Sequence, residues 1–373
     1  MTDKPKYPIL DDNLYGYNVA ESFAEYIRHG EPAMRQRGEA WRTAIGLQEV
    51  DGLHTSDYLI HTAQRHIVGD ITIADAKQLI DSYYQGRAER NEPSDRRTEE
   101  ADKVAARITE LLGEPAFTFA PTELVRIHRR LFTDIYEFAG RIRDYNITKA
   151  EWVLDGATVY YAGAEAIDAT LNYDFSQERT FTYEGLSTDE AIEHLARFTA
   201  GIWQIHPFGE GNTRTTAVFL IKYLRMFGFR IDNDAFAAHS WFFRNALVRA
   251  NYTNIPAGIH ATLEPLVRFM RFLLLGEPTD LRNRTLHIRA EEAIKVQSEP
   301  ISEPINEPIT SLSLHQTALL KLIEANPSVS LDELASQMER SRSTVKRLVD
   351  SLKRAGILAR SGARKNGVWI VSR

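Results

Sequence analysis

The chain has 373 residues, of which 43% are hydrophobic and 26% charged, and its net charge is −6. These values are those of ordinary globular proteins, and the length allows two or three domains with buried cores. The chain has no cysteine, which excludes disulfide bonds, thiolate metal sites and cysteine nucleophiles and is compatible with a reducing cytoplasm.

No stretch of the sequence predicts export or membrane insertion. Residues 1–16 contain charges and prolines and lack an apolar run of signal-peptide length. The most lipophilic run, Phe269 to Leu275, is short and contains Arg271, whereas a spanning helix needs roughly 20 apolar residues. We therefore expect a cytoplasmic protein with no membrane partner.

The N-terminal region, residues 1–95, is expected to be helical from about Ala20 to Gln85. Within it, Thr72 followed three residues later by Asp75 has the pattern of a capping box and predicts the start of a helix. Residues 83–100 are charged and polar, so we expect an exposed loop there.

A helical domain, residues 96–293, is predicted to follow. Its first helices are expected at Glu99 to Leu112 and at Glu123 to Phe132, because each segment carries its apolar residues on one face. We interpret His128, on the second of these helices, as structural.

Residues 152–161 have the pattern of a β-hairpin. Two β-prone segments, Trp152 to Leu154 and Thr158 to Tyr161, flank the turn dipeptide Asp155-Gly156. An isolated hairpin has an open edge that can hold an extended segment of another protein by main-chain hydrogen bonds. A hairpin without a binding role is the alternative.

The stretch from Gln204 to Ala217 is predicted to contain a short polar loop at the junction of two core helices. Apolar residues recur at three- and four-residue intervals on both sides of it. They are Leu195, Phe198, Ile202 and Ile205 before the loop and Val218, Ile221 and Leu224 after it.

The loop collects four kinds of chemistry. Asn212 is a candidate cap for the second helix, whose first amides, with Arg214 beside them, form an anion site. Glu210 offers an oxygen ligand for a magnesium ion that bridges phosphates, and His206 can take a proton near neutral pH. Together these residues predict a phosphoryl- or nucleotidyl-transfer site.

The same loop, read as His-Pro-Phe-x-Glu-Gly-Asn-x-Arg, resembles the signature of Fic-domain enzymes, which transfer AMP from ATP to a hydroxyl of a target protein. The resemblance implies a mainly α fold, a Fic-type helical bundle with a β-hairpin flap. The segment Gly140 to Asn146 resembles the family's Gly-x-x-Arg segment that leads into this flap. The matching signature residues are His206, Phe208, Glu210, Gly211, Asn212 and Arg214, and the target-docking flap is Trp152, Val153, Leu154, Asp155 and Gly156.

The resemblance also implies the roles of the residues. ATP is the co-substrate, with its phosphates on Gly211, Asn212 and Thr213 beside Arg214, and Mg²⁺ is held by Glu210. His206 is the catalytic base: it takes the proton of a Tyr, Ser or Thr hydroxyl that attacks the α-phosphorus, and pyrophosphate leaves.

Three positions of the nucleotide site depart from the family pattern. Thr213 stands where glycine is commonest and where lysine marks the phosphotransferring Doc-like branch, so the missing lysine argues against that branch. Ala217 stands where most members carry a second arginine for the phosphates. Phe243 falls where a tyrosine often lies next to the base; it can stack on adenine or pack in the core, and Arg244 and Asn245 are adjacent alternatives for base contact.

Residues 41–52 lie where many Fic proteins carry an inhibitory helix with the motif Ser/Thr-x-x-x-Glu-Gly/Asn. The best alignment puts Leu47 at the Ser/Thr position and Asp51 at the glutamate, which in the family pairs with the second arginine. Because Asp51 and Ala217 alter both halves of that pair, we expect a degraded inhibitor and an autoinhibition that is weak or rebuilt with other groups. Alternatively, Asp51-Gly52 is only a turn that ends a helix.

Three copies of a tetrapeptide ending in Glu-Pro-Ile mark a linker, residues 294–310, because proline at every fourth position favours an extended spacer. The last domain, residues 311–373, resembles a winged helix-turn-helix of three helices and a two-stranded wing. Its helices are expected at 314–325, at 331–338 after Ser330, and at 343–355.

From residue 310 onward the chain has eleven Lys and Arg against five Asp and Glu, so this domain is basic within an acidic protein. A basic winged helix suggests DNA as the partner. The alternative is that the domain serves for dimerisation or protein docking, so a homodimer is also possible. The basic candidates are Arg342, Lys346, Arg347, Lys353, Arg364 and Lys365.

Two functions from different classes follow. In the first, the protein is an adenylyltransferase (AMPylator) that modifies a target protein. In the second, it is a transcriptional regulator whose helical domain senses a nucleotide without catalysis and whose winged helix acts on DNA. Thr213 and Ala217 are the best support for the second.

Overall fold

The computed structural model divides the chain into two compact units, Met1–Glu303 and Pro304–Arg373. The predicted linker, residues 294–310, lies outside the described part of the chain. Within the described part, every helix is too short or too polar to span a bilayer. The described residues are 23–86, 93–231, 235–289, 314–327, 329–338, 342–354, 358–361 and 368–371.

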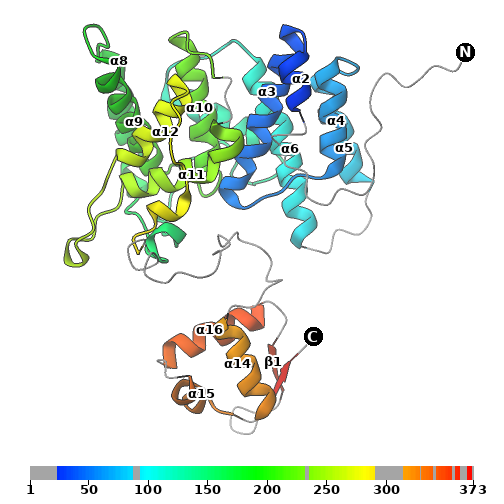
Figure 1. Ribbon diagram of the computed structural model, residues 1–373, viewed down its shortest axis with the longest axis vertical. Coiled ribbons are helices and arrows are strands. Elements are labelled where there is room, and N and C mark those ends of the chain that lie inside the picture. The colour runs from blue at the N-terminus through cyan, green and yellow to red at the C-terminus, as the bar shows by residue number, and fades with distance from the viewer. Residues whose placement is uncertain are drawn as a thin grey trace, which may run out of the picture. The chain divides into compact units, whose positions relative to one another are not determined.

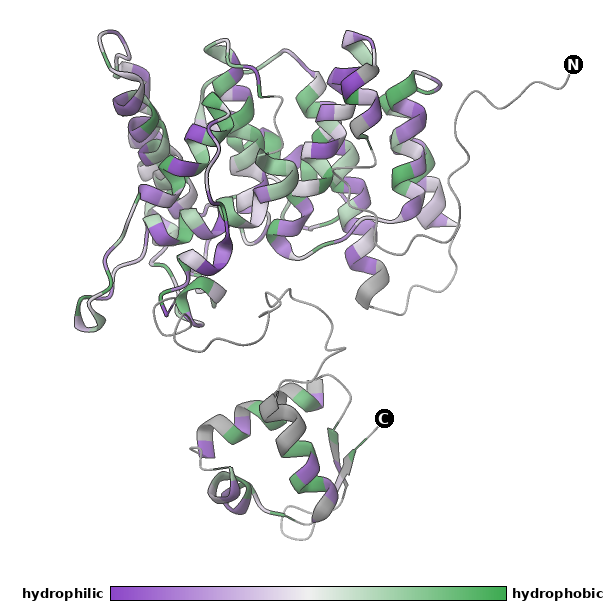
Figure 2. Cartoon of the chain, in the orientation of Figure 1, coloured by the Kyte–Doolittle hydropathy of each residue, from purple (hydrophilic) through white to green (hydrophobic). Residues whose placement is uncertain are grey.

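The larger unit is helical, as predicted, with α2–α6 gathered at one side and α8–α12 at the other (Figure 1). Its helices carry polar and apolar stretches side by side (Figure 2), the pattern of amphipathic helices around a common core. The α-helices are Ala24–His29 (α2), Pro32–Gly46 (α3), Asp57–Val68 (α4), Ile73–Gln85 (α5), Pro93–Gly113 (α6), Pro121–Phe132 (α7), Ile167–Thr180 (α8), Thr188–Ile205 (α9), Asn212–Met226 (α10), Ala235–Ala250 (α11) and Glu264–Leu275 (α12). Short 3₁₀ segments are Leu47–Asp51 (η1), Trp152–Leu154 (η2), Ala164–Ala166 (η3), Ile255–Ala257 (η4) and Asn283–Leu286 (η5).

Helix α10 runs through the middle of this unit, in contact with α6, α7 and α9. Every residue from Asn212 to Leu224 is buried. Lys222 is buried too, and its ammonium group is satisfied there because it donates to the carbonyls of Leu111 and Glu114 at 2.8 Å each. A helix packed on all sides cannot shift without disturbing the core, so its N-terminus is a fixed platform for the loop before it.

Helix starts follow their local signals, with one correction. The capping box of Thr72 and Asp75 is present at the start of α5. The loop expected over residues 83–100 is wrong at both ends, because α5 continues to Gln85 and α6 begins at Pro93. Proline suits the first turn of a helix, where its missing N–H would have no helical partner, and a polar composition does not prevent a helix.

The smaller unit has the predicted three helices and hairpin, and a capping box at Ser330 starts its second helix. Its core joins the helices to the hairpin through Trp369, whose indole N–H donates to the Val329 carbonyl at 2.9 Å. Its elements are Leu314–Ala325 (α14), Leu331–Gln337 (α15), Arg342–Arg354 (α16) and the antiparallel strands Leu358–Ser361 (β1) and Val368–Val371 (β2), with Leu358 opposite Val371.

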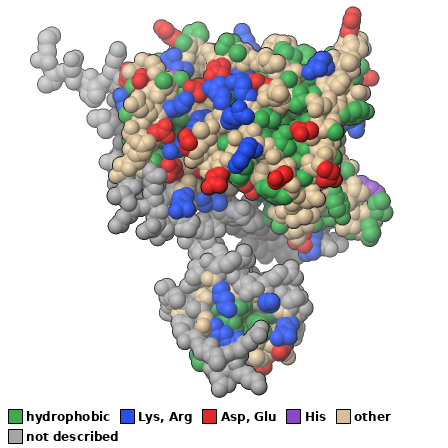
Figure 3. Space-filling view, turned by 180° about the vertical axis from the view of Figure 1, so that it is seen from behind, with side chains coloured by type: hydrophobic (Ala, Val, Ile, Leu, Met, Phe, Trp, Pro, Cys, Tyr) green, Lys and Arg blue, Asp and Glu red, His purple; other side chains and the backbone are tan. Residues whose placement is uncertain are grey.

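Basic side chains are prominent on the described surface of the smaller unit seen in Figure 3. Lys346 and Lys353 are exposed on α16, and Arg342 pairs with Asp332 at 2.9 Å. Arg364 and Lys365 lie outside the described residues.

Candidate active site

The loop of the predicted site joins α9 to α10, so the expected helix, loop and helix are confirmed. His206 ends α9 with a left-handed backbone, φ 51°, and Gly211 precedes α10 with φ 76°. A Cβ on Gly211 would lie 2.3 Å from the ring of Phe132. Only glycine therefore fits both the conformation and the space at position 211.

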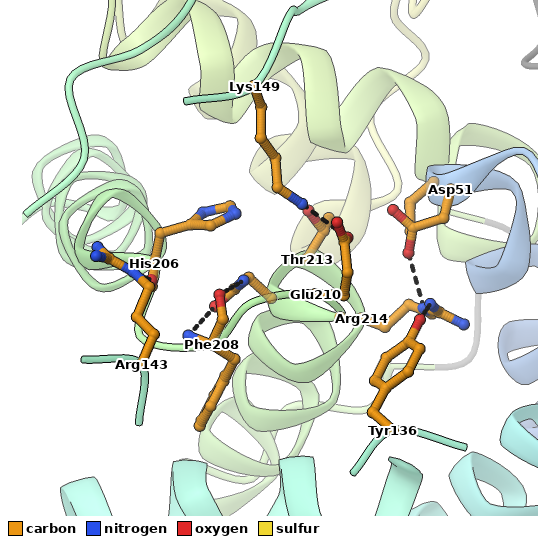
Figure 4. Close-up of polar contacts among 12 residues, drawn as sticks. Asp51, Tyr136, Arg143, Lys149, His206, Phe208, Glu210, Thr213 and Arg214 are labelled. Carbon is orange, nitrogen blue, oxygen red and sulfur yellow. Dashed lines mark hydrogen bonds and ion pairs between the residues drawn. The ribbon is translucent and has the colours of Figure 1, made fainter. Parts of the chain in front are cut away.

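Asn212 closes the loop rather than capping the helix. It is the first residue of α10, and Gly211 occupies the N-cap position, which corrects the predicted cap. The side chain of Asn212 accepts from the Phe208 amide at 3.0 Å and donates to the Phe208 carbonyl at 2.7 Å. Both bonds fix the turn between His206 and α10 (Figure 4).

The N-terminus of α10 has the properties of an anion site. Helical bonding begins at Thr215, whose amide donates to the Gly211 carbonyl at 3.0 Å. The amides of residues 212–214 precede that bond and have no acceptor within the helix. The Thr213 hydroxyl accepts from the indole N–H of Trp203 at 3.0 Å, so its side chain is held against α9.

His206 has one free ring nitrogen. Its Nδ1 donates to the Trp203 carbonyl at 3.2 Å, and its Nε2 is buried without a hydrogen-bond partner among the described residues. Burial lowers the pKa of His206 well below its ordinary value, and the nearby charge of Lys149 acts in the same direction. The imidazole is therefore neutral at pH 7, with Nε2 available to accept a proton. The ring of Tyr161 lies over it, with centroids 4.2 Å apart.

Arg143 fixes the backbone at His206. Its guanidinium donates to the carbonyls of Ile205 at 3.3 Å, His206 at 2.8 Å and Ala162 at 2.6 Å. These bonds satisfy the end of α9 and tie it to the segment that follows the flap. Sequence reasoning placed Arg143 only in the segment leading to the flap, although the Gly-x-x-Arg pattern was the signal for it.

His128 supports the loop from below and is structural, as expected. Its ring stacks on Phe208 with centroids 3.7 Å apart, and its Nε2 donates to the Glu210 carbonyl at 3.0 Å. The Gly140 amide donates to its Nδ1 at 2.8 Å. Burial lowers the pKa of His128 to about 4.

Glu210 points away from the core and pairs with Lys149 at 2.7 Å (Figure 4). The described residues contain no group of three His, Asp or Glu side chains that could hold a metal alone. Mg²⁺ in nucleotide sites is commonly bound by one or two carboxylates together with phosphate oxygens. Glu210 fits that donor set once Lys149 releases it.

Arg214 is buried and paired with two carboxylates, which the sequence did not predict. Its side chain is 1% exposed and lies 2.7 Å from Glu100 and 2.8 Å from Asp51. It also donates to Gln48 at 3.1 Å. A phosphate can reach this guanidinium only by displacing one of these partners.

The carboxylate of Asp51, at the end of η1, bridges two arginines. Its Oδ2 pairs with Arg214, and its Oδ1 accepts from Arg244 at 3.1 Å. Burial alone would raise the pKa of Asp51. The charges of Arg214 and Arg244 outweigh this effect of burial and hold the pKa below its ordinary value. The degraded pair expected from Asp51 and Ala217 is thus replaced by a different one, while Leu47 is a buried apolar residue.

The flap does not form the predicted hairpin, because residues 152–161, all of them described, contain no strand. Trp152 to Leu154 form η2, and a turn at Asp155 and Gly156, both with positive φ, follows it. Val153 and Leu154 are buried, and the Val153 carbonyl accepts from the Ile288 amide at 3.0 Å. This part of the flap therefore offers no open strand edge.

Two predicted nucleotide contacts are core residues. The ring of Phe243 is fully buried between Phe236 and Phe269, so no face of it is open to a base. Ala217 is fully buried within α10. The side chain of Asn245 donates to Asn283 at 2.8 Å, which leaves Arg244 as the neighbour that reaches the site.

A neutral imidazole, a carboxylate and an anion-binding helix terminus on one loop define the larger unit as a helical protein with a candidate nucleotide-phosphate site. Residues 118–224 match the model of the Fic/DOC family, and residues 312–366 match that of the MarR family. The chain thus contains a Fic-type domain and a MarR-type winged-helix domain.

Among similar proteins, protein adenylyltransferase VbhT of Bartonella schoenbuchensis is 29% identical over 29% of this chain and 22% of that protein. The probable protein adenylyltransferase y4lH of Sinorhizobium fredii is 33% identical over 29% of this chain and 54% of that protein. The chain therefore spans only part of each of these relatives. The solved N-terminal Fic domain of an effector protein from Bartonella sp. AR 15-3 is 23% identical over 51% of this chain and 84% of that chain, with a TM-score of 0.39.

Proposed function

We propose that this chain is a protein adenylyltransferase that moves AMP from ATP to a Tyr, Ser or Thr hydroxyl of a target protein. The observation that carries the proposal is the unpartnered Nε2 of a neutral His206 on the loop that ends at the N-terminus of α10. The relatives named protein adenylyltransferases support the same activity.

In the proposed reaction, the target hydroxyl oxygen attacks the α-phosphorus of ATP and its proton passes to His206 Nε2. The bond from the α-phosphorus to the bridging oxygen breaks, and pyrophosphate leaves. The Trp203 carbonyl holds the proton on Nδ1, so Nε2 is the basic nitrogen. The amides of residues 212–214 are fixed by the buried α10 and offer preorganised stabilisation of phosphate charge.

Glu210 would hold Mg²⁺, which neutralises phosphate charge when bound. Its partner Lys149 comes from the segment before η2, so this segment has to release the carboxylate. His206 is 3% exposed beneath Tyr161. A target hydroxyl therefore reaches Nε2 only after this ring moves aside.

The test uses ATP labelled at either the α or the γ position, incubated with the full chain in a cell lysate. We expect the α label, and not the γ label, to enter a protein band. His206→Ala should lower the transfer by roughly 10²–10⁴-fold and retain nucleotide binding, and Glu210→Gln should lower both metal-dependent binding and transfer. Undiminished transfer by His206→Ala would contradict the assignment, and a nucleotide sensor would transfer neither label.

We further propose that the winged helix binds DNA. The MarR family match and the exposed Lys346 and Lys353 on α16 support this. Fluorescence anisotropy with duplex DNA should show binding that weakens steeply with salt and weakens further in the double variant Lys346→Gln, Lys353→Gln. Binding unchanged in that variant would argue for another surface.

A further inference from the structure

Two arginines from different helices meet at one carboxylate near the proposed phosphate site. Arg214 lies in the first turn of α10 and Arg244 in α11, and each contacts a separate oxygen of Asp51, at 2.8 and 3.1 Å. Two guanidiniums that converge on one anion are the arrangement that also binds a phosphate, because planar donors match its oxygens in pairs.

Arg244 has donor capacity to spare. Its Nη1 also donates to the Val50 carbonyl at 2.9 Å, and its Nη2 donates to Glu151 at 3.0 and 3.2 Å. Its Nε is buried and has no hydrogen-bond partner among the described residues. An anion that replaced Asp51 would find a guanidinium already held in place by Val50 and Glu151.

Asp51 has the most exposed side chain of the three carboxylates in this cluster. Its side chain is 21% exposed, against 17% for Glu100 and 2% for Glu151, the other carboxylates on the two arginines. It also stands at the end of the five-residue segment η1, whereas Glu100 lies within the long helix α6. A terminal phosphate carries more negative charge and more acceptor oxygens than the carboxylate it would replace.

Helix α10 supplies one of the two guanidiniums that contact Asp51, and α11 supplies the other. One turn beyond Arg214, position 217 is a buried alanine. We infer that Arg244, from α11, provides the second guanidinium for the terminal phosphate of ATP, and that Asp51 occupies this place in the free protein. The inference rests on the proposed function, since it concerns the same nucleotide.

The competing explanation is that Arg244 only anchors η1. Arg97 is the matched control, because it donates to the carbonyls of Asp51 at 3.1 Å and Gly52 at 2.7 Å and so anchors the same segment through its backbone. The variants Arg244→Gln, Arg97→Gln and Asp51→Asn are each made with His206→Ala, so that bound nucleotide is not consumed. Binding of ATP and AMP to the full chain with Mg²⁺ is then measured by calorimetry.

We expect Arg244→Gln to weaken ATP binding by roughly ten- to a hundredfold, the loss of one hydrogen bond to a charged group, and to leave AMP binding unchanged. Asp51→Asn should strengthen ATP binding but not AMP binding, and Arg97→Gln should not weaken ATP relative to AMP. Equal ATP affinity in Arg244→Gln and its parent, or an equal loss for ATP and AMP, would overturn the inference alone. If the parent binds neither nucleotide, the proposed function fails with it.

Discussion

Acid is expected to lower the free energy of unfolding through His128, which contacts the loop of the candidate site. The Gly140 amide donates to Nδ1 of this ring, so Nδ1 has to stay unprotonated in the folded protein. A second proton would point an N–H at an N–H, in a position where the imidazole stacks on Phe208 and is fully buried. Burial, helped by the nearby charge of Arg214, lowers the pKa of His128 to about 4 from an ordinary value of 6.5.

The direction and size of the effect follow from proton linkage. As the pH falls through about 6.5 the unfolded chain takes up a proton at this residue, while the folded chain does so only near pH 4. The free energy of unfolding is therefore unaffected by His128 well above pH 6.5 and decreases below it. At about pH 5 the linkage relation gives a loss of about 2 kcal/mol from this one residue.

The measurement is urea unfolding of the full chain at about pH 7.5 and about pH 5, above and below the ordinary histidine pKa. Tryptophan fluorescence reports mainly the larger unit, since four of the five tryptophans lie there. The stability lost between the two pH values should be about 2 kcal/mol smaller in His128→Gln than in the wild type. His260→Gln, at an exposed position, is the control and should lose as much as the wild type. If His128→Gln also loses as much, burial does not set the charge state of this ring.

Two further substitutions test the geometry of the loop. Gly211→Ala should destabilise the protein by roughly 2–5 kcal/mol, because left-handed strain adds to overlap with Phe132. The control Gly258→Ala, with φ 68° and no atom within 4 Å of its Cβ, should cost only about 1–2 kcal/mol. Similar urea midpoints for the two variants would refute the overlap. Arg143→Gln should lower kcat for AMP transfer at least about tenfold by freeing the His206 backbone, while Arg107→Gln, which loses contacts to the carbonyls of Leu131 and Thr133, should leave kcat unchanged. A kcat for Arg143→Gln equal to that of Arg107→Gln would exclude a positioning role.

Local signals predicted much of the fold because they act over a few residues. Apolar periodicity placed α9 and α10, and the caps at Thr72 and Ser330 placed α5 and α15. The pairing of Asp51 with Arg214 and Arg244 was beyond such signals, because the partners come from three elements that only the tertiary fold brings together. The family pattern pairs the position of Asp51 with position 217, which lies on α10. It therefore gives no indication of an arginine on α11.

The flap shows how tertiary packing overrides a local preference. Successive side chains of a strand point to opposite faces, so a strand could not bury both Val153 and Leu154 in one core. The 3₁₀ turn of η2 buries both, at 0% and 1% exposure. Phe243 was misplaced for a related reason: spacing along α11 gave its position but not the direction of its ring, which the neighbouring Phe236 and Phe269 determine.

The polar contacts that hold Asp51 continue to the ring above His206, the proposed base. Arg244 joins Asp51 to Glu151, Glu151 accepts from the Tyr161 hydroxyl at 3.2 Å, and the Tyr161 ring covers His206. A substitution at Arg244 therefore alters both the phosphate site and the cover of the base, and a change in transfer rate alone would not separate the two. The difference between ATP and AMP binding does, because the cover over His206 is common to both nucleotides and only ATP carries the terminal phosphate.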